Sequence, residues 1–319
     1  MTIGQHIHGA RRRFFWWRVR RGWARNPITD YLGHSFVYPA DSIIGAEIAN
    51  GGEWDAALRP IVSTILTEDS PLICEVGSNL GASLLQILKA KPHARVISFE
   101  PSNRYRPLLI RNLRNAGFKQ VEVYPFLVGR TRGKSWLYNN ATTASVVSAD
   151  YDGHQPRGRQ FTNMTTLDDV FSNGGRVDFI KVDTDGFDFE VLRGGEGTLM
   201  RDQPAIFFEL EAHLLENARK DLVWLQGLGY RRFICLDYFG KLVGVTTDLD
   251  QAIVWTDNPR KYCDVLVCAD GSSYDTRLRN LDLSGVLGLS ALLVADIPTH
   301  IDVSQEETQL IADSEETVV

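Results

Sequence analysis

The chain has 319 residues, of which 44% are hydrophobic and 23% are charged, and its formal net charge is -6. These proportions are ordinary for a soluble globular protein and exclude a disordered or fibrous class. The negative charge argues against nucleic-acid binding, because neutralising phosphates requires a surplus of Lys and Arg on some face.

The first 30 residues are expected to form a basic, aromatic arm. Residues 11–25 contain seven arginines and no acid, and the run Phe14-Phe15-Trp16-Trp17 lies among them. Two interpretations stay open. The arm lies on an anionic membrane surface as a peripheral contact, or its aromatic side chains pack on the domain or on a second subunit of a homo-oligomer.

No apolar run approaches the roughly 18 residues that span a bilayer, and the N-terminus lacks the pattern of a secretory signal. The four cysteines each lie in an apolar stretch and show no metal-binding spacing, so they are expected to be buried thiols of a reducing compartment. The sequence therefore predicts a cytoplasmic protein, with the inner membrane surface as the place where the arm would act.

Residues 31–70 are expected to form a support or lid segment with a helix from Glu53 to about Thr67. The main domain, 71–269, alternates apolar strands with helices, which predicts an α/β Rossmann-like fold with a mostly parallel seven-stranded sheet and helices on both faces. The strands are expected at 72–76, 95–99, 121–125, 177–182, 205–210, 231–236 and 262–268, and the helices at 81–90, 103–116, 187–200 and 217–228.

Two further regions have weaker patterns. Leu127 to Leu137 is expected to form a hairpin around residues 130–134, and the rest of 126–162 is expected to be polar loop. Beyond Asp270, the segment 270–319 is expected to hold a helix around 275–291 and an acidic tail whose composition is typical of disorder.

The turn after the first strand of the main domain has the composition of a cofactor site. In a doubly wound sheet the ligand binds beyond the carboxyl ends of the strands, where Gly77 and Gly81 allow close approach of a ligand. Glu75 would suit the ammonium group of S-adenosylmethionine, and Glu100 is placed to accept hydrogen bonds from two ribose hydroxyls. The predicted cofactor residues are Glu75, Gly77, Ser78, Asn79, Gly81, Glu100, Pro101 and Ser102.

The same turn has two competing interpretations. A nicotinamide-dependent dehydrogenase is disfavoured, because Asn79 and Ala82 stand where the dinucleotide fingerprint has glycines. In the purely structural alternative, the glycines form a tight turn and Glu100 caps the helix that begins near Ser102.

The chain resembles the FkbM family of methyltransferases over about residues 35–235. The resemblance rests on the following segments: Gly51-Gly52-Glu53-Trp54, Glu75 to Gly81, Phe99-Glu100-Pro101, Thr166-Leu167-Asp168-Asp169 and, most specifically, Ile180 to Gly194. In the last block the family usually has Asp-x-Glu-Gly, and this chain has Asp183-Thr184-Asp185-Gly186. The resemblance implies a class I methyltransferase fold and transfer of a methyl group from S-adenosylmethionine to a hydroxyl of a sugar or related natural product.

Polar residues after the fourth and fifth strands are the candidates for catalysis, namely Asp183, Glu209 and His213. Two mechanisms stay open. In one, Asp183, Asp185 and Glu209 bind Mg²⁺ or Ca²⁺, which lowers the pKa of the acceptor hydroxyl. In the other, His213 or Asp183 acts as a metal-free general base. Asp183 and Asp185 also fit a purely structural turn, and Asp168 and Asp169 are expected to be structural at a helix start.

The sequence therefore predicts an O-methyltransferase that acts on a sugar or a glycosylated intermediate. Residues 139–145 supply small hydrogen-bonding groups suited to such an acceptor. The alternative from another class is a non-catalytic Rossmann-fold protein that recruits a partner or a membrane through its basic arm.

Overall fold

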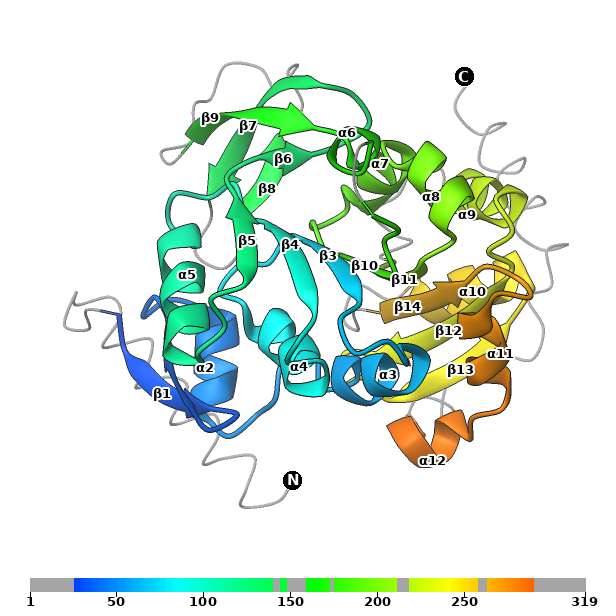
Figure 1. The fold of residues 1–319 in the computed structure, drawn as a ribbon, viewed down its shortest axis with the longest axis horizontal. Coiled ribbons are helices and arrows are strands. Elements are labelled where there is room, and N and C mark those ends of the chain that lie inside the picture. The colour runs from blue at the N-terminus through cyan, green and yellow to red at the C-terminus, as the bar shows by residue number, and fades with distance from the viewer. Residues whose placement is uncertain are drawn as a thin grey trace, which may run out of the picture.

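The structure is a computed structural model that describes residues 26–139, 144–147, 159–172, 175–210, 218–257 and 263–289. The basic, aromatic residues 11–25, the acidic tail and His213 lie outside these residues, so neither interpretation of the arm is tested. The described chain contains a large twisted sheet with helices on both sides and a small sheet beside it (Figure 1). None of the described helices is long and apolar enough to span a bilayer.

The large sheet has the order β13-β12-β14-β11-β10-β3-β4-β5. Five neighbouring strands, from β5 to β11, are parallel, whereas β14 is antiparallel to both of its neighbours and β13 is antiparallel to β12. The strand bounds are β3 Leu72–Val76, β4 Arg95–Phe99, β5 Val121–Tyr124, β10 Phe179–Val182, β11 Ala205–Glu209, β12 Arg232–Asp237, β13 Leu242–Thr246 and β14 Cys263–Cys268. All seven predicted strands are confirmed, and β13 is an additional edge strand.

Alternate residues of these strands enter two separate cores, as the pleat of a strand requires. Ile73 packs with α3, α4, α5 and α11 on one face, whereas Cys74 packs with α7, α8, α9 and α10 on the other. All four cysteines are buried free thiols, as predicted. The helix bounds are α2 Ile43–Ala49, α3 Leu58–Ile65, α4 Ala82–Ala90, α5 Arg106–Asn115, α6 Leu167–Val170, α7 Asp188–Arg193, α8 Glu196–Asp202, α9 Ala218–Gly227, α10 Leu249–Thr256, α11 Ser273–Arg279 and α12 Leu283–Leu287.

Two predicted helices are interrupted. The helix expected over 187–200 ends at Arg193 and resumes at Glu196. Gly194, between the two helices, packs against Gly129, because a Cβ atom there would lie 2.0 Å from the carbonyl oxygen of Gly129. The helix expected around 275–291 consists of α11 and the short α12. A third predicted helix is shorter than expected. It was expected from Glu53 but begins only at Leu58, so Glu53, Trp54 and Asp55 precede it.

The small sheet corrects the predicted hairpin of Leu127 to Leu137. Its strands are β6 Leu127–Val128, β7 Gly133–Asn139, β8 Ala144–Val147 and β9 Arg159–Thr165, in the order β6-β9-β7-β8. Because β9 pairs with both β6 and β7, those two strands do not pair with each other. Strands that are adjacent in sequence are often not neighbours in a sheet, and the polar composition of 159–165 concealed the strand that separates them.

The N-terminal segment packs directly on the main domain. Its hairpin, β1 Ile28–Tyr31 and β2 His34–Val37, lies beside α5. The buried side chain of Asn112 accepts a hydrogen bond from Val37 N at 2.7 Å and donates to the carbonyl oxygens of Val37 and Leu80, both at 3.0 Å. One amide therefore connects the segment to the turn that carries Gly77 and Gly81.

Candidate active site

A pocket of about 210 Å³ lies where the carboxyl ends of the parallel strands meet the N-terminal segment. Its described lining contains eight carboxylic acids and no Lys, Arg or His. The acids are Glu47, Glu53, Asp55, Glu100, Asp183, Asp185, Glu209 and Asp264. An environment of this charge favours a cationic ligand.

The turn after β3 forms one wall of the pocket. Gly77 has φ +87°, and a Cβ atom there would lie 1.9 Å from the carbonyl oxygen of Asp183, so only glycine fits. Gly81 has φ +83° and precedes α4. Gly77 and Ser78 donate backbone N–H groups to Phe99 O at 3.0 and 3.3 Å, which joins this turn to the end of β4.

Glu100, directly after β4, lies in the same wall and is buried. Its Oε2 accepts a hydrogen bond from Asn79 N at 2.7 Å, and its Oε1 accepts one from Ser102 N at 2.8 Å. Burial raises the pKa of Glu100 to about 7, although these two N–H groups oppose the rise. Each carboxylate oxygen retains further acceptor capacity, as recognition of two ribose hydroxyls requires.

Ser78, Asn79 and Pro101 also line the pocket, whereas the lining includes neither Gly81 nor Ser102. Ser102 instead begins the helical turn before α5, because its Oγ accepts hydrogen bonds from Arg104 N at 3.1 Å and Tyr105 N at 3.4 Å. Ser78, Asn79 and Pro101 therefore fit the predicted cofactor site, whereas Ser102 has a structural role at the start of the helical turn.

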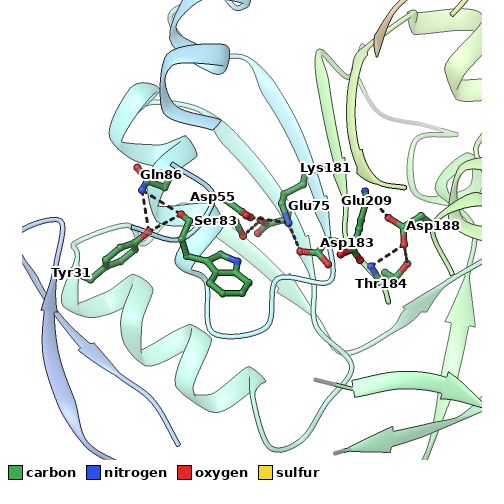
Figure 2. A network of polar contacts seen from close by, with 11 residues as sticks. Tyr31, Asp55, Glu75, Ser83, Gln86, Lys181, Asp183, Thr184, Asp188 and Glu209 are labelled. Atoms are coloured by element: carbon green, nitrogen blue, oxygen red, sulfur yellow. Dashed lines mark hydrogen bonds and ion pairs between the residues drawn. The ribbon is translucent and has the colours of Figure 1, made fainter. Parts of the chain in front are cut away.

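Glu75 is not placed as the sequence suggested. Its side chain is 0% exposed, it is not part of the pocket lining, and its Oε1 accepts a hydrogen bond from Ser83 Oγ at 2.6 Å. It lies on the inner side of the pocket wall, next to Lys181 and Asp55 (Figure 2). Glu75 thus contributes negative charge from beneath the pocket but presents no surface to a ligand.

Lys181 is a buried cation that joins the carboxylates at the end of β10. Its side chain is 1% exposed, and Nζ lies 2.9 Å from Asp183 Oδ2 and 3.4 Å from Asp55 Oδ2. Burial alone would lower the pKa of Lys181, but the carboxylates of Asp183, Asp55 and Glu75 outweigh it and hold that pKa well above its ordinary value. Lys181 is therefore charged, and it keeps Asp183 in place.

The buried acid Asp188 shapes the turn after β10. Asp188 accepts hydrogen bonds from Thr184 N at 3.0 Å and Thr184 Oγ1 at 2.7 Å, and its other oxygen accepts one from Glu209 N at 3.2 Å. Asp185 in this turn has φ +52° and Gly186 has φ +85°, so the chain bends sharply before α7. Asp188 thereby connects the ends of β10 and β11, and Asp183 and Glu209 line the same pocket.

Three important residues were missed in the predicted site: Lys181, Asp55 and Asp264. Lys181 and Asp264 interrupt apolar strands, and a buried charge in such a strand requires a partner, so this signal could have identified both. Asp264 is opposite Glu209 in the pairing of β14 with β11. Burial, together with Asp55, Asp183 and Asp188, raises the pKa of Asp264 well above its ordinary value despite Lys181. Asp55 had no comparable signal beyond its position after Gly51-Gly52-Glu53-Trp54.

The predicted metal site is not supported. Asp183, Asp185 and Glu209 all line the pocket, but within the part of the chain that the structure describes no three His, Cys, Asp or Glu side chains are grouped to hold an ion. Asp183 faces Lys181 instead. The general-base candidate His213 and the loop residues 140–143 lie outside the described ranges. Asp168 is structural, as predicted, because it accepts hydrogen bonds from Gly197 N and Thr198 N at the start of α8.

The sheet order and the glycine turn at the strand ends define the Rossmann-like fold of a class I methyltransferase. Residues 75–232 match the family model of the methyltransferase FkbM domain. Residues 75–232 therefore form a methyltransferase domain of the FkbM family, as the sequence resemblance indicated.

Two solved structures illustrate the likeness in fold. The methyltransferase FkbM from Methylobacillus flagellatus KT is 17% identical with a TM-score of 0.44, over 68% of this chain and 49% of that one. The O-methyltransferase from Bacillus cereus in complex with SAH is 15% identical with a TM-score of 0.40, over 67% of this chain and 80% of that one. The chain thus spans about half the length of the first structure. A sequence search of curated proteins gave no match.

The pocket residues fit S-adenosylmethionine by their chemistry. The cofactor has a sulfonium and an ammonium group, and the described lining is acidic without a compensating Lys, Arg or His. Glu100 offers acceptors for ribose hydroxyls, and Gly77 lines the pocket while its missing side chain lets the turn pack against the Asp183 backbone. Asp55 Oδ2 is buried, and the contact that the structure describes for it is the 3.4 Å ion pair with Lys181 Nζ.

Proposed function

We propose that this protein transfers a methyl group from S-adenosylmethionine to a hydroxyl group of a saccharide or glycosylated intermediate. The observation that carries the proposal is the pocket that brings Glu100 and Gly77 together with the carboxylates of Asp183 and Glu209. When bound, S-adenosylmethionine supplies an electrophilic methyl group on a positively charged sulfur. The chain supplies the binding wall and the groups that handle the hydroxyl proton.

Asp183 is the residue that accepts this proton in the proposal. Its side chain is 36% exposed, and its only described hydrogen bond is the one from Lys181 to Oδ2. Oδ1 is therefore available to an acceptor hydroxyl, while Lys181 fixes the direction of the carboxylate. A positioned base of this kind typically contributes about 10²- to 10⁴-fold to the rate.

A groove beside the pocket supports a saccharide as the acceptor. Its lining includes Asn103, Gln160, Thr162 and Asn163, and it shares Phe126 with the pocket. Gln160 donates a hydrogen bond to Pro101 O at 2.7 Å, which connects the groove to the segment after β4 that carries Glu100. Amide and hydroxyl side chains of this type pair with the many hydroxyls of a sugar.

Exposed aromatic rings adjoin the same groove. Trp136 on β7 and Phe161 on β9 are 41% and 53% exposed, and their ring centroids are 4.9 Å apart. Exposed apolar patches mark binding sites, and a flat ring can stack on the C–H face of a pyranose. The combination of aromatic faces and amides favours a sugar over a purely apolar acceptor.

The proposal is tested by incubating the purified protein with S-adenosylmethionine labelled in its methyl group and a panel of saccharides and glycosides. Labelled product is expected with at least one of them. Calorimetry should show binding of the donor, and this binding should be lost in Gly77→Val, where the added side chain meets Asp183 O. If the wild-type protein does not bind the donor, the proposal is wrong and the non-catalytic alternative is favoured.

A further inference from the structure

We propose that Asp55, which comes from the N-terminal segment, binds the α-ammonium group of S-adenosylmethionine. This inference rests on the proposed function and assigns a new residue to the same site. It also gives the segment that precedes the methyltransferase domain a direct part in donor recognition.

The position of Asp55 is the first argument. Asp55 lines the pocket together with Gly77 and Asp183, so it lies at the same pocket as the glycine turn after β3 and the end of β10. Its backbone is in the left-handed region, with φ +49°. A non-glycine residue adopts this conformation at a cost in free energy, and such residues cluster at functional sites. The turn therefore holds Asp55 against its own preference.

The charge around Asp55 is the second argument. Figure 2 shows the side chains of Asp55, Glu75 and Asp183 around the ammonium group of Lys181. One cation thus faces three carboxylates, and the excess negative charge lies next to the pocket. Burial, Asp183 and Glu75 raise the pKa of Asp55 to about 6, although Lys181 opposes the rise. A second cation would relieve this repulsion and favour the ionised form.

The unfilled hydrogen-bonding capacity is the third argument. Lys181 Nζ lies 3.4 Å from Asp55 Oδ2, a long contact that leaves this buried oxygen without a well-formed hydrogen bond. A buried carboxylate oxygen that is left unpaired costs free energy, and an ammonium group supplies three donors.

Four other acids of the pocket are less suited to this role. Glu53 forms an ion pair with Arg59 at 3.1 Å, and Glu47 accepts a hydrogen bond from Tyr238 Oη at 2.7 Å. Asp183 receives the hydrogen bond from Lys181. Burial and neighbouring carboxylates raise the pKa of Asp264 well above its ordinary value, which disfavours its ionised form. Asp55 therefore combines a place in the pocket lining with a carboxylate whose ion pair with Lys181, at 3.4 Å, is longer than the one between Lys181 and Asp183, at 2.9 Å.

The test compares three ligands by calorimetry in the full-length protein. S-adenosylmethionine and S-adenosylhomocysteine carry the ammonium group, whereas 5′-methylthioadenosine has the same nucleoside and thioether without the amino acid. Asp55→Asn removes the charge and keeps the shape. This variant is expected to lower the affinity for the first two ligands about tenfold or more. Its affinity for the third ligand should stay within about twofold of the wild-type value.

Two further variants make the outcome interpretable. Asp55→Glu keeps the charge and should retain more affinity for S-adenosylmethionine than Asp55→Asn. Asp69→Asn removes an exposed charge from the same segment and should change no affinity. Equal weakening of all three ligands in Asp55→Asn, or unchanged binding of S-adenosylmethionine, overturns the inference alone. Failure of the wild-type protein to bind S-adenosylmethionine overturns the proposed function and the inference together.

Discussion

The ammonium group of Lys181 on β10 lies 3.4 Å from the carboxylate of Asp55, which belongs to a segment that precedes the whole sheet. The same ammonium group donates to Asp183 at 2.9 Å. One buried cation thus connects the N-terminal segment with the candidate base. Because Asp55 and Asp183 both line the pocket, its geometry depends on how this segment docks on the sheet.

Replacing Lys181 with Met should strongly destabilise the protein. The variant leaves Asp55, Asp183 and Glu75 without their buried counter-ion, and loss of one partner of a buried pair typically costs about 3–5 kcal/mol. Urea unfolding should show this loss as a lower midpoint. In the double variant Lys181→Met with Asp55→Asn, part of the loss should be recovered, because one uncompensated charge is gone.

An exposed lysine provides the control for that experiment. Lys220→Met on α9 should change the free energy of unfolding by less than about 0.5 kcal/mol. If Lys181→Met were as mild as Lys220→Met, Lys181 would not be the structural counter-ion of the pocket.

The sequence predicted the sheet well because its strands are apolar runs that alternate with amphipathic helices. The strands β3 and β4 agree with their predicted ranges at both ends. A strand that is buried on both faces is apolar along its whole length, so it can be recognised from its own short stretch of sequence. The turn at Gly77 and the acid at Glu100 were found for a related reason, since both stand directly at strand ends.

The contacts between distant segments were not predictable in the same way. Glu75 was expected to face the ligand, but a strand residue points to one of two faces and the sequence does not say which face the pocket occupies. Asp55 has no periodic pattern and reaches the site only through the docking of the N-terminal segment. The hairpin error at β6 and β7 has the same origin, because β9 pairs with them from a later part of the chain.

Gly77→Ala should be far more damaging than the same change at Gly117. Both glycines have a similar positive φ, +87° and +85°, so alanine has a similar backbone cost of about 1–2 kcal/mol at each. Only at Gly77 would the new Cβ atom meet Asp183 O, at 1.9 Å, whereas nothing lies within 4 Å at Gly117. Thermal unfolding should therefore show a larger loss for Gly77→Ala, which should also lose donor binding. Equal losses in the two variants would contradict this packing.

Glu100 should make stability fall as the pH rises. Burial raises its pKa from an ordinary 4.5 to about 7, so between these values the folded state binds more protons than the unfolded state. The free energy of unfolding then decreases with increasing pH across this window. Glu100→Gln removes the titration. Wild type should therefore lose stability relative to this variant between about pH 4.5 and 7, as urea titrations at several pH values would show. A constant difference over that range would mean that Glu100 titrates normally.

The same shift predicts proton release on donor binding. A ribose hydroxyl forms a stronger hydrogen bond with a carboxylate than with a protonated acid. The positive charge of bound S-adenosylmethionine also favours the ionised forms of Asp55 and Glu100. The affinity for S-adenosylmethionine should therefore rise from about pH 5.5 to about pH 8. Calorimetry in buffers of different ionisation enthalpy should detect protons released at about pH 6.5. Net proton uptake on binding would contradict this charge assignment.

The aromatic pair on the small sheet should control the acceptor rather than the donor. Trp136→Ala and Phe161→Ala each remove an exposed ring, and aromatic contacts contribute about 0.5–1.5 kcal/mol beyond their area. The KM for the saccharide should rise about threefold to tenfold in each variant, with little change in kcat and none in donor affinity. Met200→Ala removes an exposed apolar side chain from α8 and should have no effect. A fall in donor affinity in the ring variants would instead assign this surface to the cofactor, and unchanged kinetics would place the acceptor elsewhere.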